Sequence, residues 1–259
     1  IGHFYIKEMN WQKAHYFFNK QIELSKELKY IHGIIASYIN KKSLEANRGN
    51  LIKAKAYLDK ALTIANQNNA VQELLRLKLR LGLLYFDFRK FDKSLFYFNK
   101  LIKYAASKSN YYFLCLANYN IGIVYKKKEI LPKSLEFFQK AEKLSRQYSL
   151  RLEFYKIINQ IISILIFMDK PAQAKTYLAE KDVIKKAPHK TSIFLKINQS
   201  IIEFKLERNR EIRRELLNKI DDKLKIIDGG EDYFEYKYKL IKLYETEYDN
   251  KNIVDVKKQ

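Results

Sequence analysis

Five polar residues recur at intervals of 40 along this 259-residue chain, each within a segment otherwise rich in apolar residues. The column consists of Asn40, Arg80, Asn120, Gln160 and Ser200. All five side chains can donate a hydrogen bond, and an asparagine or glutamine amide can donate to a peptide carbonyl while it accepts from a peptide N–H. Repeated along one surface, such groups could hold an extended peptide by its backbone. The alternative is that the column is a solvated row of polar side chains.

The same spacing runs through the apolar positions. One column is large and mostly aromatic: Phe17, Tyr57, Tyr97, Phe137, Tyr177 and Leu217. Three residues upstream, five of six positions are small: Ala14, Ala54, Ser94, Ser134 and Ala174, with Arg214 in the sixth. A fixed period of this length is typical of a solenoid, in which each repeat buries its apolar face by stacking on its neighbours.

Within each repeat, the apolar spacing predicts two helices joined by a short polar turn. Leu81 and Tyr85 are four residues apart and therefore share one helix face. We expect second helices near residues 11–26, 51–66, 91–106, 131–147, 171–186 and 211–226. The predicted fold class is therefore all-α, an α-α superhelix of about six helical hairpins over residues 1–228. Residues 229–259, beginning with Gly229-Gly230, are predicted to form a capping helix or the start of a seventh repeat.

The sequence Leu81-Gly82-x-x-Tyr85, followed by Ser94 and Phe98, resembles the tetratricopeptide repeat. The resemblance extends from residue 1 to about residue 221, in a long variant similar to that of bacterial sensor and regulator proteins. Its period exceeds the roughly 34 residues of the family, and longer helices would absorb the difference. The second repeat departs from the motif with Lys41, Lys42 and Glu45, and the fifth and sixth repeats fit it less well than the third and fourth.

The resemblance implies that the first helices line a concave groove and that the polar column faces it. Flanking side chains on the same face would then select the ligand: Tyr119, Lys126, Lys156, Asn159, Ser163, Lys196 and Gln199. The function so implied is a non-catalytic scaffold that binds a peptide or protein segment. By analogy of architecture, the scaffold would be the sensor or interaction domain of a larger bacterial transcriptional regulator or signalling protein.

A formal net charge of +21 predicts attraction to acidic partners and raises nucleic-acid binding as the alternative function. The lysines are dispersed over solvent positions of the repeats instead of forming one block: Lys13, Lys53, Lys93, Lys133 and Lys175 are examples. Most aromatic residues occupy the core columns and are not placed to stack on bases. A peptide or protein ligand is therefore favoured over a nucleic acid.

The sequence predicts no enzyme and no cofactor. The four histidines show no i, i+4 pairing that would hold a metal ion: His3, His15, His32 and His189. Acidic pairs at Asp221-Asp222 and Glu231-Asp232 fit solvated helix ends. The single cysteine, Cys115, lies on an apolar helix face, which predicts a buried side chain.

The chain begins at Ile1, without methionine and inside a repeat, and the pattern runs out at Gln259 before a second helix is completed. We therefore expect a fragment of a larger protein. No apolar stretch approaches the roughly 20 residues that a membrane-spanning helix needs, and a cytoplasmic location is favoured.

Overall fold

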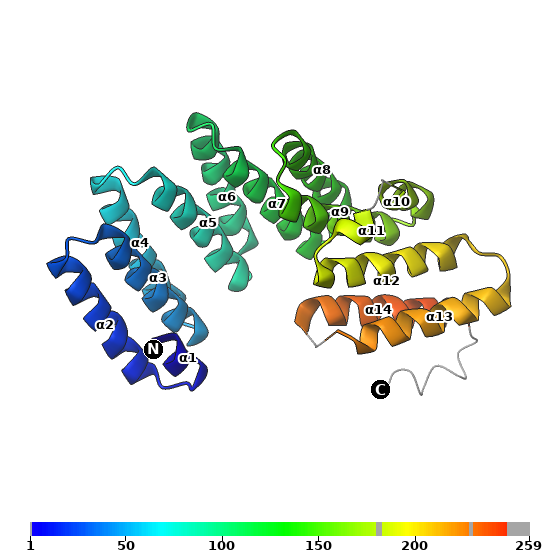
Figure 1. The fold of residues 1–259 in the computed structure, drawn as a ribbon, viewed down its shortest axis with the longest axis horizontal. Coiled ribbons are helices and arrows are strands. Elements are labelled where there is room, and N and C mark those ends of the chain that lie inside the picture. The colour runs from blue at the N-terminus through cyan, green and yellow to red at the C-terminus, as the bar shows by residue number, and fades with distance from the viewer. Residues whose placement is uncertain (1, 180–182, 228–229, 248–259) are drawn as a thin grey trace. The chain divides into compact units, whose positions relative to one another are not determined.

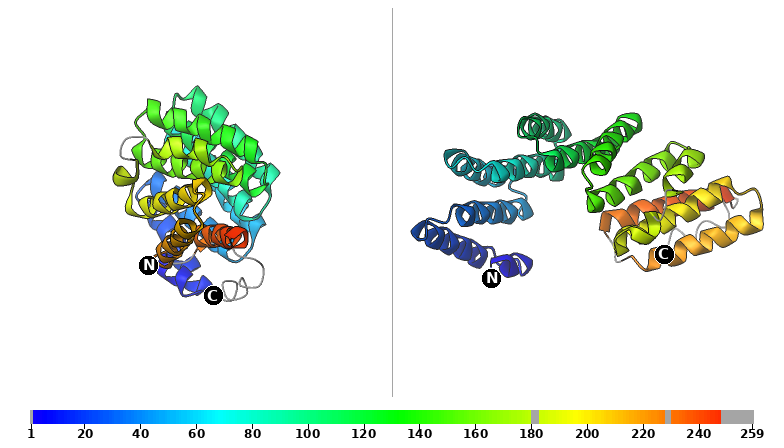
Figure 2. Two further views of the ribbon diagram at one scale, coloured as in Figure 1. Left: turned by 90° about the vertical axis from the view of Figure 1, so that its right-hand side faces the viewer. Right: turned by 45° about the horizontal axis from the view of Figure 1, so that its top comes forward.

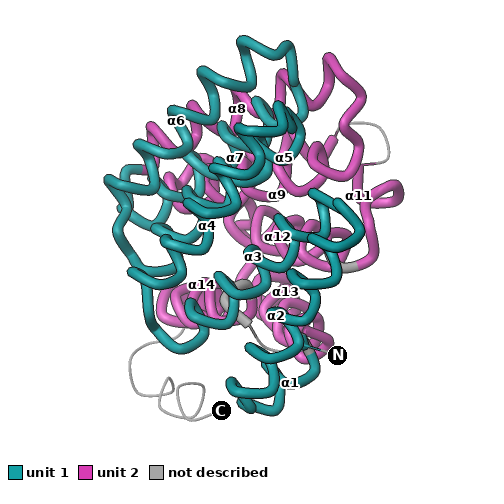
Figure 3. Tube along the Cα trace, turned by 90° about the vertical axis from the view of Figure 1, so that its left-hand side faces the viewer, with its two compact units in different colours: residues 1–130 teal, residues 131–259 magenta. Residues whose placement is uncertain are grey.

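The computed structural model describes residues 2–179, 183–227 and 230–247. Every regular element among these residues is an α-helix, as the sequence predicts. The chain forms two compact units, residues 1–130 (unit 1) and residues 131–259 (unit 2), drawn in teal and magenta in Figure 3. Within each unit, helices that follow one another in the chain pack side by side.

Unit 1 consists of one short helix followed by helices of equal length. The helices are α1 (Gly2–Lys7), α2 (Trp11–Glu27), α3 (Ile31–Asn47), α4 (Leu51–Gln67), α5 (Val71–Asp87), α6 (Phe91–Ser107) and α7 (Tyr111–Lys127). From α2 to α7 each helix has 17 residues, and the starts of successive helices are evenly spaced along the chain. Figures 1 and 2 show these helices stacked as hairpins within unit 1.

One type of three-residue turn produces this spacing. Between α2 and α3, Lys29 adopts a left-handed conformation with φ of 51°. The Lys29 N–H donates to the Lys26 carbonyl at 3.0 Å, and the Tyr30 N–H donates to the Ser25 carbonyl at 2.7 Å. This pair of bonds is the Schellman motif, which satisfies the last carbonyls of a helix. Tyr30 is also the N-cap of α3, so one residue ends one turn and begins the next helix.

The left-handed residue recurs at the same even spacing along the chain. The other positions are Met9, Gly49, Asn69, Arg89, Ser109, Glu129, Ser149 and Asp169. Asparagine side chains cap several of the helices that follow, since Asn10, Asn50 and Asn110 each accept the backbone N–H three residues later. The structural period is therefore one helix with the turn that follows it. The longer period of the sequence comprises two such helix-and-turn units.

Small residues let the paired helices of unit 1 approach closely. A Cβ atom on Gly82 of α5 would lie 2.3 Å from Cε1 of Phe98 on α6, so only glycine fits there. The Ser94 hydroxyl donates to the Gly82 carbonyl at 2.8 Å. Tyr85 stacks on Tyr97 with the ring centroids 5.2 Å apart. Ser94 of the small column and Tyr97 of the aromatic column therefore both pack from α6 onto α5.

Unit 2 begins with the same spacing and then loses it. Its helices are α8 (Leu131–Gln147), α9 (Arg151–Phe167), α10 (Pro171–Leu178), α11 (Val183–Lys186), α12 (His189–Leu206), α13 (Arg210–Lys225) and α14 (Gly230–Glu247). Helices α8 and α9 keep 17 residues each. Helix α12 begins at His189, two positions before the place that the period of the sequence requires.

The predicted second helix over 171–186 is wrong, because α10 ends at Leu178 and only the short α11 follows it. Earlier second helices bury apolar or small residues at two positions of their second half, such as Leu101 and Ala105 of α6. The sequence has Lys181 and Lys185 at the corresponding places. A helix that buried two unpaired ammonium groups would be strongly destabilised, so the regular packing cannot continue there.

The C-terminal helix of unit 2 is attached by buried charges. The Glu247 carboxylate is almost fully buried and lies 3.2 Å from Nε of Arg210 and 3.0 Å from Nε of Arg213, both on α13. Helix α14 therefore packs with the helices before it. The predicted boundary at residues 228–229 and the segment 248–259 lie outside the described residues.

The turn geometry predicts that Arg89→Gly stabilises unit 1. An arginine with φ of 54° bears the steric cost of the left-handed region, which glycine avoids. Glycine also raises the conformational entropy of the unfolded chain, which offsets part of this gain. We therefore expect a net increase of about 0.5–1 kcal/mol in the free energy of unfolding. Urea denaturation followed by circular dichroism measures this change.

Gly49→Ala is the matched control for the turn. Gly49 has φ of 76°, and no atom lies within 4 Å of the place that an alanine methyl group would take, so only backbone strain changes. We expect a loss of about 1 kcal/mol. A destabilised Arg89→Gly protein, or an unaffected Gly49→Ala protein, would show that these turns do not constrain the stability of the repeats.

Candidate functional site

Unit 1 places three members of the polar column at equivalent points of its first helices. Asn40 lies on α3, Arg80 on α5 and Asn120 on α7, and all three are half-buried. The Asn120 Nδ2 atom donates to the Leu116 carbonyl of its own helix at 2.7 Å. An asparagine amide has two N–H groups and an acceptor oxygen, so this bond uses only part of its capacity.

Arg80 of the column and Lys42 of α3 are half-buried cations. Burial lowers the pKa of the Arg80 guanidinium, and the neighbouring Arg76 lowers it further, whereas Glu73 raises it. Burial is also the main cause of the lowered pKa of Lys42 on α3, followed by the charge of Arg80. The charge of Arg80 thus acts against that of Lys42, and Asp87 partly offsets this effect by raising the Lys42 pKa.

The sequence prediction omitted Lys42. Lys42 departs from the repeat motif at a position where the family has a glycine. A charged side chain that replaces a packing residue of a first helix is the signal that could have identified it. The predicted flanking residues Tyr119 and Lys126 are both half-buried on α7.

In unit 2 the predicted residues of α9 have different surroundings. Gln160 is half-buried and Lys156 is exposed, but Asn159 and Ser163 are buried. The Asn159 Oδ1 atom accepts Nδ2 of Asn198 on α12 at 2.9 Å. Asn198 also donates to the Tyr236 hydroxyl on α14 at 2.8 Å. Asn159 therefore joins three helices of unit 2 through its side chain.

Ser163 takes part in a second set of contacts with α14. Its hydroxyl donates to Glu235 Oε1 at 2.9 Å and accepts Lys239 Nζ at 2.8 Å. Lys239 is buried, pairs with Glu235 at 3.0 Å and lies 4.2 Å from the centroid of the Tyr236 ring. The hydrogen-bonding groups of Asn159 and Ser163 thus serve packing inside unit 2, a role that the sequence did not suggest.

Ser200, the last member of the column, does not share the environment of the first three. It is buried, its hydroxyl donates to the Lys196 carbonyl at 3.2 Å, and it accepts Nζ of Lys223 on α13 at 2.7 Å. The burial pattern of α12 follows that of α9 at an interval of 40, since Ile197, Ile201 and Phe204 are buried as Ile157, Ile161 and Ile164 are. The different surroundings of Ser200 come from α13, which supplies Lys223. The predicted flanking residues Lys196 and Gln199 are exposed.

Other candidate chemistry is sparse in the part of the chain that the structure describes. No group of three or more histidine, cysteine, aspartate or glutamate residues is arranged to hold a metal ion among the described residues. Cys115 is buried on α7, as predicted. Among the same residues, no helix combines the length and apolar character that crossing a bilayer requires.

Comparison with known proteins identifies the repeat. Residues 75–108, which span α5 and α6 almost completely, match the family model of the tetratricopeptide repeat. Among curated protein sequences, none matches the chain. The chain thus contains a tetratricopeptide repeat at the place where its sequence fits the motif best.

Solved structures with the same fold are helical repeat proteins. The signal transduction ATPase with a tetratricopeptide repeat sensor from Pyrococcus horikoshii has a TM-score of 0.70 at 15% identity, over 95% of this chain and 37% of its own. Aspartyl phosphate phosphatase F from Bacillus subtilis has a TM-score of 0.73 at 14% identity, over 98% of this chain and 66% of its own.

A third similar structure is the apo form of the quorum sensor NprR from B. thuringiensis, with a TM-score of 0.70 at 14% identity, over 99% of this chain and 74% of its own. NprR in complex with its cognate peptide NprX aligns with a TM-score of 0.54. The chain spans about a third of the length of the ATPase and about two thirds of that of the phosphatase. These likenesses confirm the predicted fold class, a solenoid of helical hairpins.

The buried position of Asn159 predicts that Asn159→Ala destabilises unit 2. The substitution removes the acceptor of Asn198 and leaves buried polar atoms unpaired, which costs about 1–3 kcal/mol. Lys156→Ala on the same helix is the control, and its exposed side chain predicts a change within about 0.5 kcal/mol. Equal unfolding midpoints in urea for the two variants would contradict the packing role of Asn159.

Proposed function

We propose that this chain, which carries a tetratricopeptide repeat, is a non-catalytic scaffold that binds a peptide, as the sensor or interaction region of a bacterial regulatory protein. The observation that carries the proposal is the recurrence of Asn40, Arg80 and Asn120 at equivalent, half-buried points of α3, α5 and α7. Three side chains with hydrogen-bonding capacity, spaced by identical helix pairs, suit the repeating amides of an extended backbone.

The charges of unit 1 favour a ligand with an acidic group. Residues 1–130 contain 23 lysines and arginines against 9 aspartates and glutamates, whereas residues 131–259 contain 27 against 20. Part of that excess lies in the column itself at Arg80 and at its neighbour Lys42, where Asp87 and Glu73 offset it in part. A carboxylate of the peptide bound there would gain attraction from two partly desolvated cations, where the interaction is stronger than in water.

Two further observations support the proposal. NprR in complex with NprX is an example of a protein of similar fold that holds a peptide, although its identity of 14% carries no residue across. The flanking side chains Tyr119 and Lys126 are half-buried on α7 and would contact ligand side chains beside the backbone. For Gln160, Lys156, Lys196 and Gln199 of unit 2, a role in ligand contact stays a prediction.

Substitution of the unit 1 column tests the function. The triple variant Asn40→Ala, Arg80→Ala and Asn120→Ala removes three polar groups, and we expect it to weaken peptide binding by about 10- to 100-fold. Peptides retained from a lysate of the source organism are identified by mass spectrometry, and their affinities for wild type and variant are then compared at low and at high salt.

The matched control is Asn66→Ala, Arg89→Ala and Asn99→Ala, which removes the same residue types from exposed positions. It should bind as wild type does. Equal binding by the column variant would refute the proposal. Recovery of nucleic acid alone, released by high salt from all three proteins, would instead support the nucleic-acid alternative, because phosphate contacts release counterions.

A further inference from the structure

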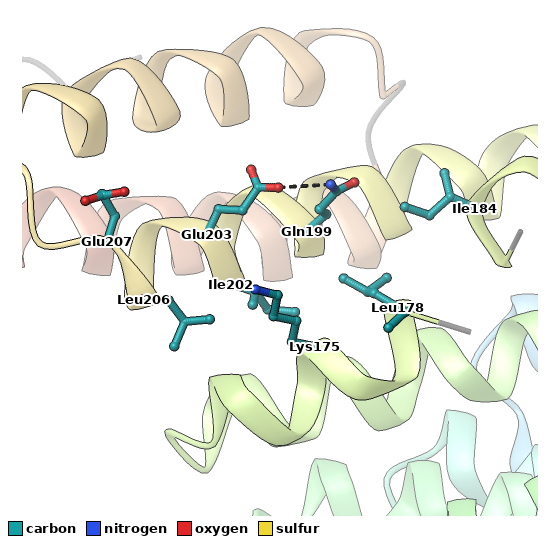
Figure 4. Close-up of a pocket in the computed structure, with 9 residues that line it drawn as sticks. Lys175, Leu178, Ile184, Gln199, Ile202, Glu203, Leu206 and Glu207 are labelled. Atoms are coloured by element: carbon teal, nitrogen blue, oxygen red, sulfur yellow. Dashed lines mark hydrogen bonds between the residues drawn. The ribbon is translucent and has the colours of Figure 1, made fainter. Parts of the chain in front are cut away.

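The early end of α10 leaves a pocket in unit 2. The cavity has a volume of about 390 Å³ and lies among α10, α11 and α12 (Figure 4). It is lined by Lys175, Leu178, Ala179, Ile184, Gln199, Ile202, Glu203, Leu206 and Glu207. We call it the α10–α12 pocket. Its size falls within the range typical of ligand sites, about 300–1,000 Å³.

The walls of the α10–α12 pocket present apolar side chains. Ile202 on α12 is 2% exposed, whereas Leu206, one turn further along, is 44% exposed. Leu178 of α10 and Ile184 of α11 are half-buried. A second helix of full length would continue past residue 178, whereas α10 stops there and Leu206 remains open to solvent. Apolar surface exposed in a concave site favours binding of an apolar group.

Two carboxylates lie at the α12 side of the pocket. Figure 4 shows Glu203 and Glu207 on this side, with the Glu203 Oε1 atom accepting Nε2 of Gln199 at 2.9 Å. Glu207 accepts the backbone N–H groups of Arg208 and Asn209, which lower the pKa of its carboxyl group. The two backbone hydrogen bonds of Glu207 therefore favour its ionised form.

Neither carboxylate forms an ion pair within the described part of the chain, although cations outnumber anions by 50 to 29. The charge of Glu203 does act on Lys223 of α13, whose pKa it raises against the lowering effect of burial. The nearby Asp169, by contrast, pairs with Lys205 at 2.7 Å. Among the described residues that line the pocket, the one cation is Lys175 on α10, on the wall opposite the carboxylates. The pocket is thus net acidic in a basic protein, and it complements a ligand that is both apolar and basic.

We propose that the α10–α12 pocket binds a segment of a partner protein in which an aliphatic side chain is followed by lysine or arginine. The aliphatic side chain lies against Ile202 and Leu206, where its burial drives binding. The basic group pairs with Glu203 and Glu207, and Lys175 donates to a backbone carbonyl of the segment. This site uses none of Asn40, Arg80 and Asn120 and goes beyond the proposed peptide-binding function.

Selection from a phage-displayed library of random dodecapeptides tests the pocket. The full chain is the bait, and we expect enriched sequences with Leu, Ile or Val beside Lys or Arg. The affinity of one enriched, fluorescently labelled peptide is then measured by anisotropy. Leu206→Ser should weaken it about tenfold, because half of the apolar contact is lost. Glu203→Gln keeps the acceptor for Gln199 and should weaken it severalfold at low salt and less at high salt.

Two exposed residues of unit 2 serve as matched controls. Leu152→Ser on α9 and Glu215→Gln on α13 change the same residue types outside the pocket and should leave the affinity unchanged. Circular dichroism confirms that each variant is folded. The proposal is overturned if no sequence is enriched, if the enriched sequences are acidic, or if Leu206→Ser binds as tightly as Leu152→Ser. Loss of binding in the Asn40, Arg80 and Asn120 variant alone would assign the peptides to unit 1 instead.

Discussion

The left-handed turn between helices is the constraint on which the rest of the structure depends. It ends one helix, satisfies its last carbonyls and caps the next helix within three residues. Eight residues other than glycine adopt this conformation, from Met9 to Asp169. Their steric cost is tolerated because each turn satisfies several backbone groups at once. Identical turns and helices of identical length space the helix starts evenly, and two successive helices return each side chain to the same face.

The polar column and the α10–α12 pocket both follow from that constraint. While the even spacing holds, Asn40, Arg80 and Asn120 occupy the same point of three successive first helices. After Asp169 the series of turns ends, α10 is short and α12 starts early. Ser200 then contacts α13, and the pocket opens beside α12. The regular part of the chain thus repeats one surface, and the irregular part creates a local site.

Buried charged groups hold α14 of unit 2 in place. Lys239 and Glu247 are both buried on α14, and each has an oppositely charged partner. Buried ion pairs contribute little net stability because of the desolvation cost, but a single misplaced partner is strongly unfavourable. Such groups therefore favour one register of α14 against α9 and α13 over its alternatives.

The sequence alone determined the helical class, the repeat interval and the columns of small and of aromatic residues, because these depend on periodicities along the chain. The sequence also indicates the end of α10, because Lys181 and Lys185 stand where earlier repeats have apolar or small residues. Only the tertiary structure decided that Ser163 contacts Lys239, 76 residues away, and that Asn159 is buried while its neighbour Gln160 is not. Those outcomes depend on α14, which contacts α9 and α12 from a distant part of the sequence and leaves no mark on the local pattern of α9.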